Sequence, residues 1–176
     1  MTGVKKTIEE LIKLYKNIMI FLKEANVELI LFYGSLLGYY RNLEFINEDD
    51  DIDIIICRKD YDILKTYINS NIHKYPEIKI GINNNSILQL FSDNVGPFDI
   101  YAFDNYNDDI LIRWDGNLLF DTKDIFPIKT ITFHDYNISI PSNTENILFQ
   151  TYGKNWKIPQ KKYNYNWRLI NTVKKL

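Results

Sequence analysis

The stretch YGSLLGYYRNLEFINEDDDIDIII, from Tyr33 to Ile56, decides how the rest of the chain is interpreted. It opens with a glycine–serine turn, continues through a short helical pattern to an arginine, and ends in aspartates that lead into isoleucines. Burying an ionised carboxylate is costly unless a cation or several hydrogen bonds compensate its charge. The aspartates at the entrance to an apolar strand therefore need a chemical explanation.

Asp51 and Asp53 lie at the start of DIDIIIC, residues 51–57, a segment typical of a buried strand. Alternate side chains of a strand share a face, so these two carboxylates lie together with Asp49 and opposite the isoleucines. Two anions on one face repel each other unless a cation lies between them, and oxygen ligands without nearby histidine or cysteine favour Mg²⁺ or Mn²⁺. We therefore predict that Asp51 and Asp53 bind a metal ion. Asp49 and Asp50 fit a solvated turn equally well.

Asp99 is the predicted third carboxylate of this site. It lies within PFDIYAF, residues 97–103, another apolar segment with the composition of a strand. Alone, such an acid fits an edge strand with an outward-facing side chain. In combination with Asp51 and Asp53, it predicts three carboxylates that bind metal and take part in catalysis.

A phosphate-binding turn is predicted beside the carboxylates. Gly34 lets a ligand approach the backbone closely, and Ser35 with the helix start that follows offers N–H groups to an anion. If residues 35–42 are helical, Arg41 lies on the same face as Gly34, and an arginine can bind phosphate through two hydrogen bonds. A small-residue packing contact with a surface arginine explains the same residues, so the turn gains weight only alongside the three aspartates.

The composition is that of one globular domain, covering residues 1–176, with 45% apolar and 15% aromatic residues. A net charge of −2 gives no basis for general binding to nucleic acid or to anionic membranes. The longest apolar run near the N-terminus is IMIFL, which is far shorter than the roughly 20 residues of a bilayer-spanning helix. We therefore expect a cytoplasmic protein with no signal peptide, no transmembrane segment and no membrane insertion.

Helical and strand patterns alternate over the first part of the chain and give way to strands in the middle. A capping-box pattern at Thr7 and Glu10 begins an amphipathic helix over residues 7–25. The segments that follow it are a strand at 27–34, a helix at 35–42, a strand at 51–57 and a helix at 58–72. Four further strands are predicted at EIKIGI, SILQLFS, PFDIYAF and DILIRWD. This order predicts an α+β or mixed α/β domain.

These motifs, in this order, resemble the LicD/fukutin family of the nucleotidyltransferase-fold superfamily. The segment GSLLGYYRNLEFINEDDDID is similar to that family's G-[ST]-L-L-G-x-x-R and x-G-F-I-x-W-D-D-D-I-D motifs. Further along, FDIYAFD, IFPIKTITFHDYNISIP and YGKNWKIP are similar to three later family motifs. Asn42, Glu48 and Ala102 depart from the residues that many members have, while the predicted metal ligands match the family pattern.

The resemblance implies an α+β nucleotidyltransferase (polymerase-beta-like) fold, in which helices flank a mixed central sheet. It also implies a metal-dependent phosphotransferase that moves a phospho-alcohol group, phosphocholine or ribitol phosphate, from a CDP-linked donor to a glycan hydroxyl. The roles it implies are Mg²⁺ (or Mn²⁺) binding and catalysis by Asp51, Asp53 and Asp99, and donor-phosphate contacts by Gly34, Ser35 and Arg41.

The segment YGKNWKIPQKKYNYNWR, residues 152–168, interleaves basic and aromatic side chains. Such a pattern fits single-stranded nucleic acid, which binds through stacking and charge, but it fits an amphipathic closing segment packed on the core better. With the family resemblance, Lys154 and Trp156 are the predicted substrate contacts, to the donor phosphates and to a base or sugar. A short closing helix is predicted from about Tyr163.

Two other functions stay open on the same fold. A nucleotidyltransferase would move a nucleoside monophosphate from an NTP to a small-molecule or protein hydroxyl. An inactive nucleotide-binding module would keep the scaffold without turnover. The three retained aspartates disfavour the inactive module, because a silent site gains nothing from uncompensated buried charge.

Overall fold

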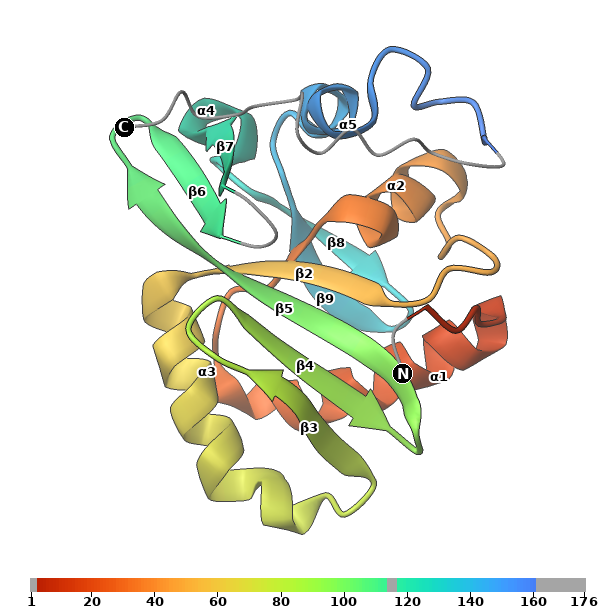
Figure 1. Cartoon of the computed structure of the whole chain (residues 1–176), viewed down its shortest axis with the longest axis vertical. Helices are drawn as coiled ribbons and strands as arrows, with labels where there is room; N and C mark the ends of the chain where they lie inside the picture. Colours follow the sequence, from red (N-terminus) through yellow and green to blue (C-terminus); the bar gives the residue numbers. More distant parts are fainter. Residues whose placement is uncertain (1–2, 114–116, 161–176) are drawn as a thin grey trace.

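A computed structural model describes residues 3–113 and 117–160 of the chain (Figure 1). The α-helices are α1 (Ile8–Leu22), α2 (Tyr33–Asn42), α3 (Arg58–Asn71), α4 (Thr122–Ile125) and α5 (Thr144–Tyr152). Two short 3₁₀ helices are η1 (Lys23–Ala25) and η2 (Ile72–Lys74). The strands are β1 (Ile30–Leu31), β2 (Ile52–Cys57), β3 (Ile78–Asn83), β4 (Ile87–Ser92), β5 (Val95–Tyr106), β6 (Asp109–Arg113), β7 (Asn117–Asp121), β8 (Lys129–Phe133) and β9 (Tyr136–Ile140).

The nine strands of the described residues form one mixed sheet. Its main path runs β3-β4-β5-β2-β1-β9-β8, and the β6–β7 hairpin extends from the second half of β5. β2 pairs parallel with β5 and β1 pairs parallel with β9, whereas the other neighbouring pairs are antiparallel. The parallel pair β2–β5 therefore lies in the middle of the sheet, where its two strands are covered on both faces.

Helices cover the sheet and complete the core. α1 buries an apolar stripe that includes Leu11, Tyr15 and Ile18, and it packs on β4 and β5. In the view of Figure 1, α2 and α5 lie above β2, while α1 and α3 lie below it. None of the helices in residues 3–113 and 117–160 is both long and apolar enough to cross a bilayer.

The predicted fold class is confirmed, because helices flank a mixed central sheet. The strand predicted at 27–34 is wrong in extent: it is reduced to Ile30–Leu31, since the chain turns into α2 at Tyr33. Tyr33 has a left-handed φ of 40°, and the preceding Phe32 N–H donates to the carbonyl oxygen of Asp53 at 3.1 Å. The turn is thereby placed directly against β2.

Gly38 sets the distance between α2 and the segment that leads to the aspartates. A Cβ atom placed on Gly38 would lie 2.5 Å from the carbonyl oxygen of Glu44 and 3.0 Å from the backbone nitrogen of Ile46. Both neighbours are backbone atoms, so they can give way only if the chain between α2 and β2 moves. Gly38 is therefore a small residue at a close packing contact, which is one of the two explanations that the sequence offered for this helix.

Gly38→Ala is expected to lower the free energy of unfolding by about 1–3 kcal/mol, because the added methyl group displaces the backbone at Glu44 and Ile46. Urea denaturation followed by circular dichroism measures this. Asn42→Ala, in the same helix, is the control: Asn42 is exposed, so its replacement is expected to change stability by less than about 0.5 kcal/mol. Equal stability of Gly38→Ala and the wild type would contradict the close approach.

Candidate active site

A row of three polar side chains crosses the centre of the otherwise apolar sheet. Asp53 on β2 lies opposite Asp99 on β5, and Asp99 lies opposite Gln89 on β4. Their exposed fractions are 7%, 3% and 4%, so the whole row is buried. Strand pairing thus brings together Asp53 and Asp99, two of the three predicted metal ligands.

Asp53 joins β2 to the beginning of α2. Its Oδ2 accepts a hydrogen bond from the Gly34 N–H at 3.1 Å, and its own N–H donates to the Ser35 hydroxyl oxygen at 3.0 Å. Gly34 and Ser35 therefore lie at the carboxylates, as predicted for a turn beside them. Burial raises the pKa of Asp53 well above its usual range, and the charges of Asp51 and Asp99 raise it further.

Asp49, Asp50 and Asp51 form an acidic rim in the loop before β2. Each offers a carboxylate oxygen within 4.8 Å of the others. A Cβ atom placed on Gly34 would lie 2.9 Å from Oδ2 of Asp49 and 3.4 Å from Oδ2 of Asp53, so the rim and the strand reach the same corner. Burial, together with the neighbouring aspartates, raises the pKa of Asp51 to about 8. Burial likewise raises the pKa of Asp49 to about 6.

The rim differs from the sequence-based expectation in its local structure. β2 begins at Ile52, so the strand alternation expected to align Asp49, Asp51 and Asp53 does not extend to the first two. Asp49 and Asp50 are half-buried, which a solvated turn does not explain. The loop has no periodic pattern, and the sequence therefore could not place these carboxylates relative to the Gly34 corner.

Lys6 belongs to this site, although no motif in the sequence points to it. It is 7% exposed, and its Nζ donates to the carbonyl oxygens of Val4, at 2.8 Å, and of Asp50. Its backbone N–H donates to the Asp49 carbonyl oxygen at 2.9 Å, while its own carbonyl accepts from the Glu48 N–H at 3.0 Å. Burial lowers the pKa of Lys6, and the nearby carboxylates oppose that change. The rim is thus held by a buried cation.

The two carboxylate oxygens of Asp99 have different surroundings. Oδ2 accepts hydrogen bonds from the Gln89 amide and the Tyr101 hydroxyl, each at 3.3 Å. Oδ1 is buried and has no hydrogen-bond partner within the described part of the chain. A buried acceptor without a partner costs about 1–3 kcal/mol, a cost that a bound ligand can remove. Burial also raises the pKa of Asp99 to about 6.

The donor set fits a hard divalent cation. The rim and the two strand aspartates offer carboxylate oxygens, which Mg²⁺ and Mn²⁺ prefer, and the close rim group contains neither histidine nor cysteine. Positive charge would relieve both the mutual repulsion of the aspartates and the unpartnered Asp99 Oδ1. Among the described residues, the close carboxylate group consists of Asp49, Asp50 and Asp51 and includes neither Asp53 nor Asp99. Metal binding by Asp51, Asp53 and Asp99 therefore stays a prediction.

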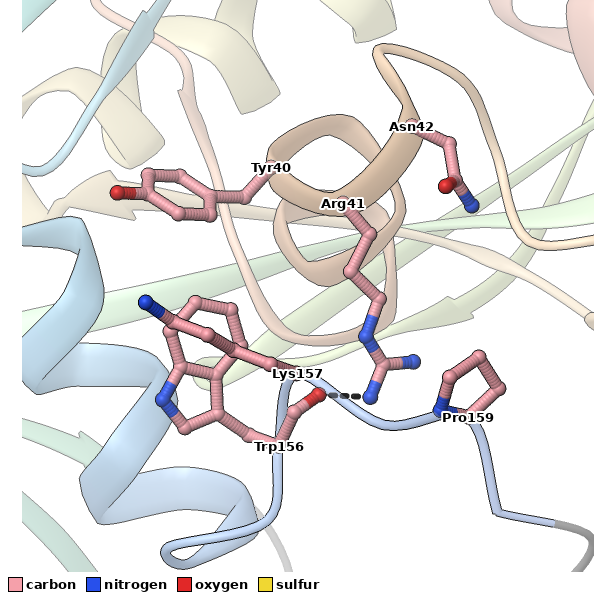
Figure 2. A pocket seen from close by; sticks show the side chains of 6 residues that line it. All are labelled: Tyr40, Arg41, Asn42, Trp156, Lys157 and Pro159. Carbon is pink, nitrogen blue, oxygen red and sulfur yellow. Dashed lines mark hydrogen bonds between the residues drawn. The ribbon is translucent and has the colours of Figure 1, made fainter.

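A second polar feature lies at the C-terminal end of α2 (Figure 2). A pocket of about 280 Å³ is lined there by Tyr40, Arg41, Asn42, Trp156, Lys157 and Pro159. The Arg41 guanidinium donates to the carbonyl oxygens of Trp156 and, at 3.3 Å, of Ile158. The pocket therefore brings together Arg41 and Trp156, two of the predicted substrate-binding residues.

The predicted contacts after α5 differ in how accessible they are. Trp156 is only 4% exposed, and its ring packs edge-on against Tyr40 with centroids 5.4 Å apart. Lys154 is exposed and does not line the pocket. The basic and aromatic residues of 161–168, and the closing helix predicted from Tyr163, lie outside the described residues.

Comparison with protein families gives a match over most of the chain. Residues 26–143 match the family described as LicD/FKTN/FKRP, nucleotidyltransferase domain. The matched range contains the Gly34 corner, the acidic rim and Asp99, and it therefore covers the carboxylate site in full, apart from Lys6.

Curated relatives include the ribitol-5-phosphate transferase FKTN of two mammals. The protein from Mus musculus is 28% identical over 156 residues, which cover 82% of this chain and 32% of that protein. The protein from Homo sapiens is 26% identical over 173 residues, which cover 92% of this chain and 35% of that protein. The chain thus spans about a third of the length of these relatives.

Solved structures show the same fold. The lincomycin-bound lincosamide antibiotic adenylyltransferase LnuA matches 82% of this chain and 86% of its own, with a TM-score of 0.52 and 19% identity. ANT(2")-Ia in complex with adenylyl-2"-tobramycin matches 84% of this chain and 78% of its own, with a TM-score of 0.51 and 12% identity. The predicted nucleotidyltransferase fold is therefore confirmed.

Asp53→Asn is expected to raise the free energy of unfolding of the metal-free chain at pH 8 by about 1–4 kcal/mol. The carboxyl pKa values near 6 and 8 exceed the ordinary 3.8, so the folded state keeps protons that the unfolded chain releases. Stability is therefore lost as the pH rises from about 4 through about 8, and the variant escapes part of that loss. Urea denaturation in EDTA at pH 5 and pH 8 measures the gain, which should shrink at pH 5.

Asp124→Asn is the matched control, because Asp124 is also buried, at 3% exposed, but lies outside the site. Its carboxylate accepts hydrogen bonds from the side-chain amides of Asn143 at 2.8 Å, Asn146 at 2.6 Å and Gln150 at 3.1 Å. Asparagine would turn an amide group toward these donors and lower the free energy of unfolding by about 1–3 kcal/mol. If the free energy of unfolding changed with the same sign in Asp53→Asn and Asp124→Asn, repulsion between carboxylates would not be what distinguishes Asp53 from Asp124.

Proposed function

Since the chain belongs to the LicD/FKTN/FKRP family of nucleotidyltransferase domains, we propose that residues 1–176 act as one metal-dependent phosphotransferase domain. The proposed donor is a CDP-linked alcohol, and the group transferred to a carbohydrate hydroxyl is its phospho-alcohol part. The name of the mammalian relatives supports ribitol phosphate most directly, and phosphocholine is the other donor group of this chemical class. The observation that carries the proposal is the pairing of Asp53 with Asp99 beside Gly34.

The proposed reaction is a displacement at phosphorus. The acceptor hydroxyl oxygen forms a bond to the phosphorus atom that carries the alcohol, and the bond from that phosphorus to the bridging oxygen of the pyrophosphate breaks. CMP leaves with the bridging oxygen, and the hydroxyl proton passes to a base of the protein. The products are CMP and a glycan that carries the alcohol through a phosphodiester.

Asp99 is the proposed base. Its Oδ1 is buried without a partner in the described residues, so a lone pair is available to accept the hydroxyl proton. A carboxylate within hydrogen-bond reach of the acceptor hydroxyl can take up its proton as the hydroxyl oxygen bonds to phosphorus. The pairing of Asp99 with Asp53, which accepts from the Gly34 N–H, supports this role.

Asp51, Asp53 and Asp99 are the proposed ligands of Mg²⁺ or Mn²⁺. A divalent cation, when bound, supplies positive charge that stabilises the donor pyrophosphate and the departing nucleotide. Asp53 also holds the Gly34 N–H, and so keeps the first turn of α2 against the carboxylates. The N-terminus of α2 carries the positive end of the helix dipole, which favours a phosphate at Gly34 and Ser35.

Arg41, Lys154 and Trp156 are the proposed contacts to the rest of the donor. The Arg41 guanidinium donates to the carbonyl oxygens of Trp156 and Ile158 and so fixes the shape of the pocket. Its proposed role is to attract the donor's anionic part through its positive charge. Lys154 is exposed in the loop after α5, and its proposed partner is a donor phosphate. Trp156 forms the pocket wall beside Tyr40, against which a base or sugar can rest.

Incubation of the chain with Mg²⁺, an oligosaccharide acceptor and CDP-ribitol or CDP-choline is expected to release CMP, measured by liquid chromatography. Mass spectrometry should find the phospho-alcohol on the glycan. CTP and ATP are the comparison, and neither is expected to release pyrophosphate. Pyrophosphate from an NTP without CMP from the CDP-alcohols would replace this proposal by nucleotidyl transfer. Binding of all four donors without turnover would favour an inactive module.

Asp51→Asn, Asp53→Asn and Asp99→Asn are each expected to lower kcat, by roughly 10²–10⁴-fold where a proton-transfer group is lost. The CMP-release assay measures this loss. Asp104→Asn is the control, because Asp104 lies on the same strand as Asp99 but pairs with Arg58 at 2.9 Å, outside the site. It is expected to retain kcat. If Asp53→Asn kept the wild-type kcat, the Asp53 carboxylate would have no role in the proposed reaction.

A further inference from the structure

We infer that Gln89 and Tyr101 are positioning residues that give the two carboxylate oxygens of Asp99 separate tasks. They hold Oδ2 in place, and they leave Oδ1 as the atom that faces the metal ion or the acceptor hydroxyl. The inference rests on the proposed function and names the atom through which Asp99 acts.

Both donors reach the same oxygen from fixed positions. Gln89 lies directly opposite Asp99 on β4, and its Nε2 donates to Oδ2 at 3.3 Å. Tyr101 follows two residues later on the same face of β5, and its hydroxyl donates to Oδ2 at 3.3 Å. Each of the two side chains is 4% exposed, so neither has room to turn away.

The other carboxylate oxygen of Asp99, Oδ1, differs from Oδ2 because it accepts no hydrogen bond in the described part of the chain. Asp99 Oδ1 is buried, and within residues 3–113 and 117–160 nothing donates a hydrogen bond to it. A carboxylate that served only the fold would have both oxygens satisfied, as Asp124 does. Its Oδ1 accepts from Asn143, while its Oδ2 accepts from Asn146 and Gln150. The contrast between these two buried aspartates assigns Asp99 Oδ1 to a ligand.

Two donors on one oxygen also restrict rotation of the carboxylate group. A catalytic constellation must be held within about 0.5 Å of its productive geometry by neighbours whose own rotamers are fixed. Gln89 and Tyr101 meet this requirement because both are buried in central strands. The buried Gln89 would otherwise be hard to explain, since burial of an amide in an apolar strand is unfavourable unless its hydrogen bond serves a purpose.

Gln89→Met and Tyr101→Phe remove one donor each with little change of volume. Loss of such an outer-shell partner typically weakens metal binding about 10–100-fold, and the same loss of Mn²⁺ affinity is expected here. The Mn²⁺ Kd of the full chain without donor is measured from the free Mn²⁺ signal in electron paramagnetic resonance. In the CMP-release assay, at a Mg²⁺ concentration that saturates each variant, kcat is expected to fall. The KM for the CDP-alcohol should then stay unchanged, because the cation is fully bound and Oδ1 does not bind the nucleotide.

Gln150→Met is the matched control, because Gln150 donates to a buried carboxylate at 3.1 Å outside the site. It should lose stability much as Gln89→Met does but keep the wild-type Mn²⁺ Kd. If Gln89→Met does not fold, Tyr101→Phe, which loses only a hydroxyl group, carries the test. Wild-type Mn²⁺ affinity in the folded variants, or equal losses in Gln150→Met, would overturn the inference.

Asp53→Asn separates failure of the inference from failure of the proposed function. If Asp53→Asn loses Mn²⁺ binding and the Gln89 and Tyr101 variants do not, the metal site stands and the positioning role falls. If wild type and Asp53→Asn bind Mn²⁺ equally weakly, the proposed metal-dependent function falls, and the inference falls with it. Loss of Mn²⁺ affinity in all three variants, with Gln150→Met unchanged, supports both.

Discussion

Repulsion among buried carboxylates is the interaction on which the rest of this structure depends. Asp53 and Asp99 lie opposite each other on parallel strands, and the charges of Asp51 and Asp99 make Asp53 harder to ionise. The groups that counter this repulsion are the Gly34 N–H, the Gln89 amide, the Tyr101 hydroxyl and the Lys6 ammonium. None of them neutralises the site fully. The protein therefore keeps closely spaced, buried carboxylates in the middle of its sheet, and carboxyl groups with raised pKa values of this kind are typical of functional sites.

The topology brings these carboxylates and the Gly34 corner together through short segments of chain. β1 is only two residues long, yet it pairs with β2 on one side and β9 on the other, so it fixes where α2 begins. After the left-handed turn at Tyr33, the Gly34 N–H donates to the Asp53 side chain. Gly38 lets the chain return close to the helix on its way to the acidic rim. The start of α2, the strand β2 and the acidic rim therefore meet at Gly34.

The site residues that could be predicted from the sequence are charged side chains within apolar strand segments. Asp53 and Asp99 were predicted because an acid among isoleucines and aromatics is costly, and both proved to be buried side by side. Gln89 is likewise a polar residue within the apolar segment SILQLFS, but burying a neutral amide costs less than burying a charge, so the pattern is a weaker signal. Lys6 lies far from the motif and contacts the rim only through tertiary structure, and Asp49 lies in a loop without periodicity. Their places depend on the folded chain, which a pattern along the sequence does not contain.

The attachment of residues 3–6 beneath the acidic rim has a practical consequence for anyone who handles the protein. The Gly3 N–H donates to Asp50 Oδ2 at 2.5 Å, and Lys5 pairs with Glu48 at 2.6 Å, in addition to the bonds of Lys6. A purification tag or fluorescent fusion placed ahead of this segment would be attached directly to the residues that bind the rim and the adjacent Glu48, namely Gly3, Lys5 and Lys6. A tag at this position can therefore disturb the acidic rim as well as the segment to which it is attached.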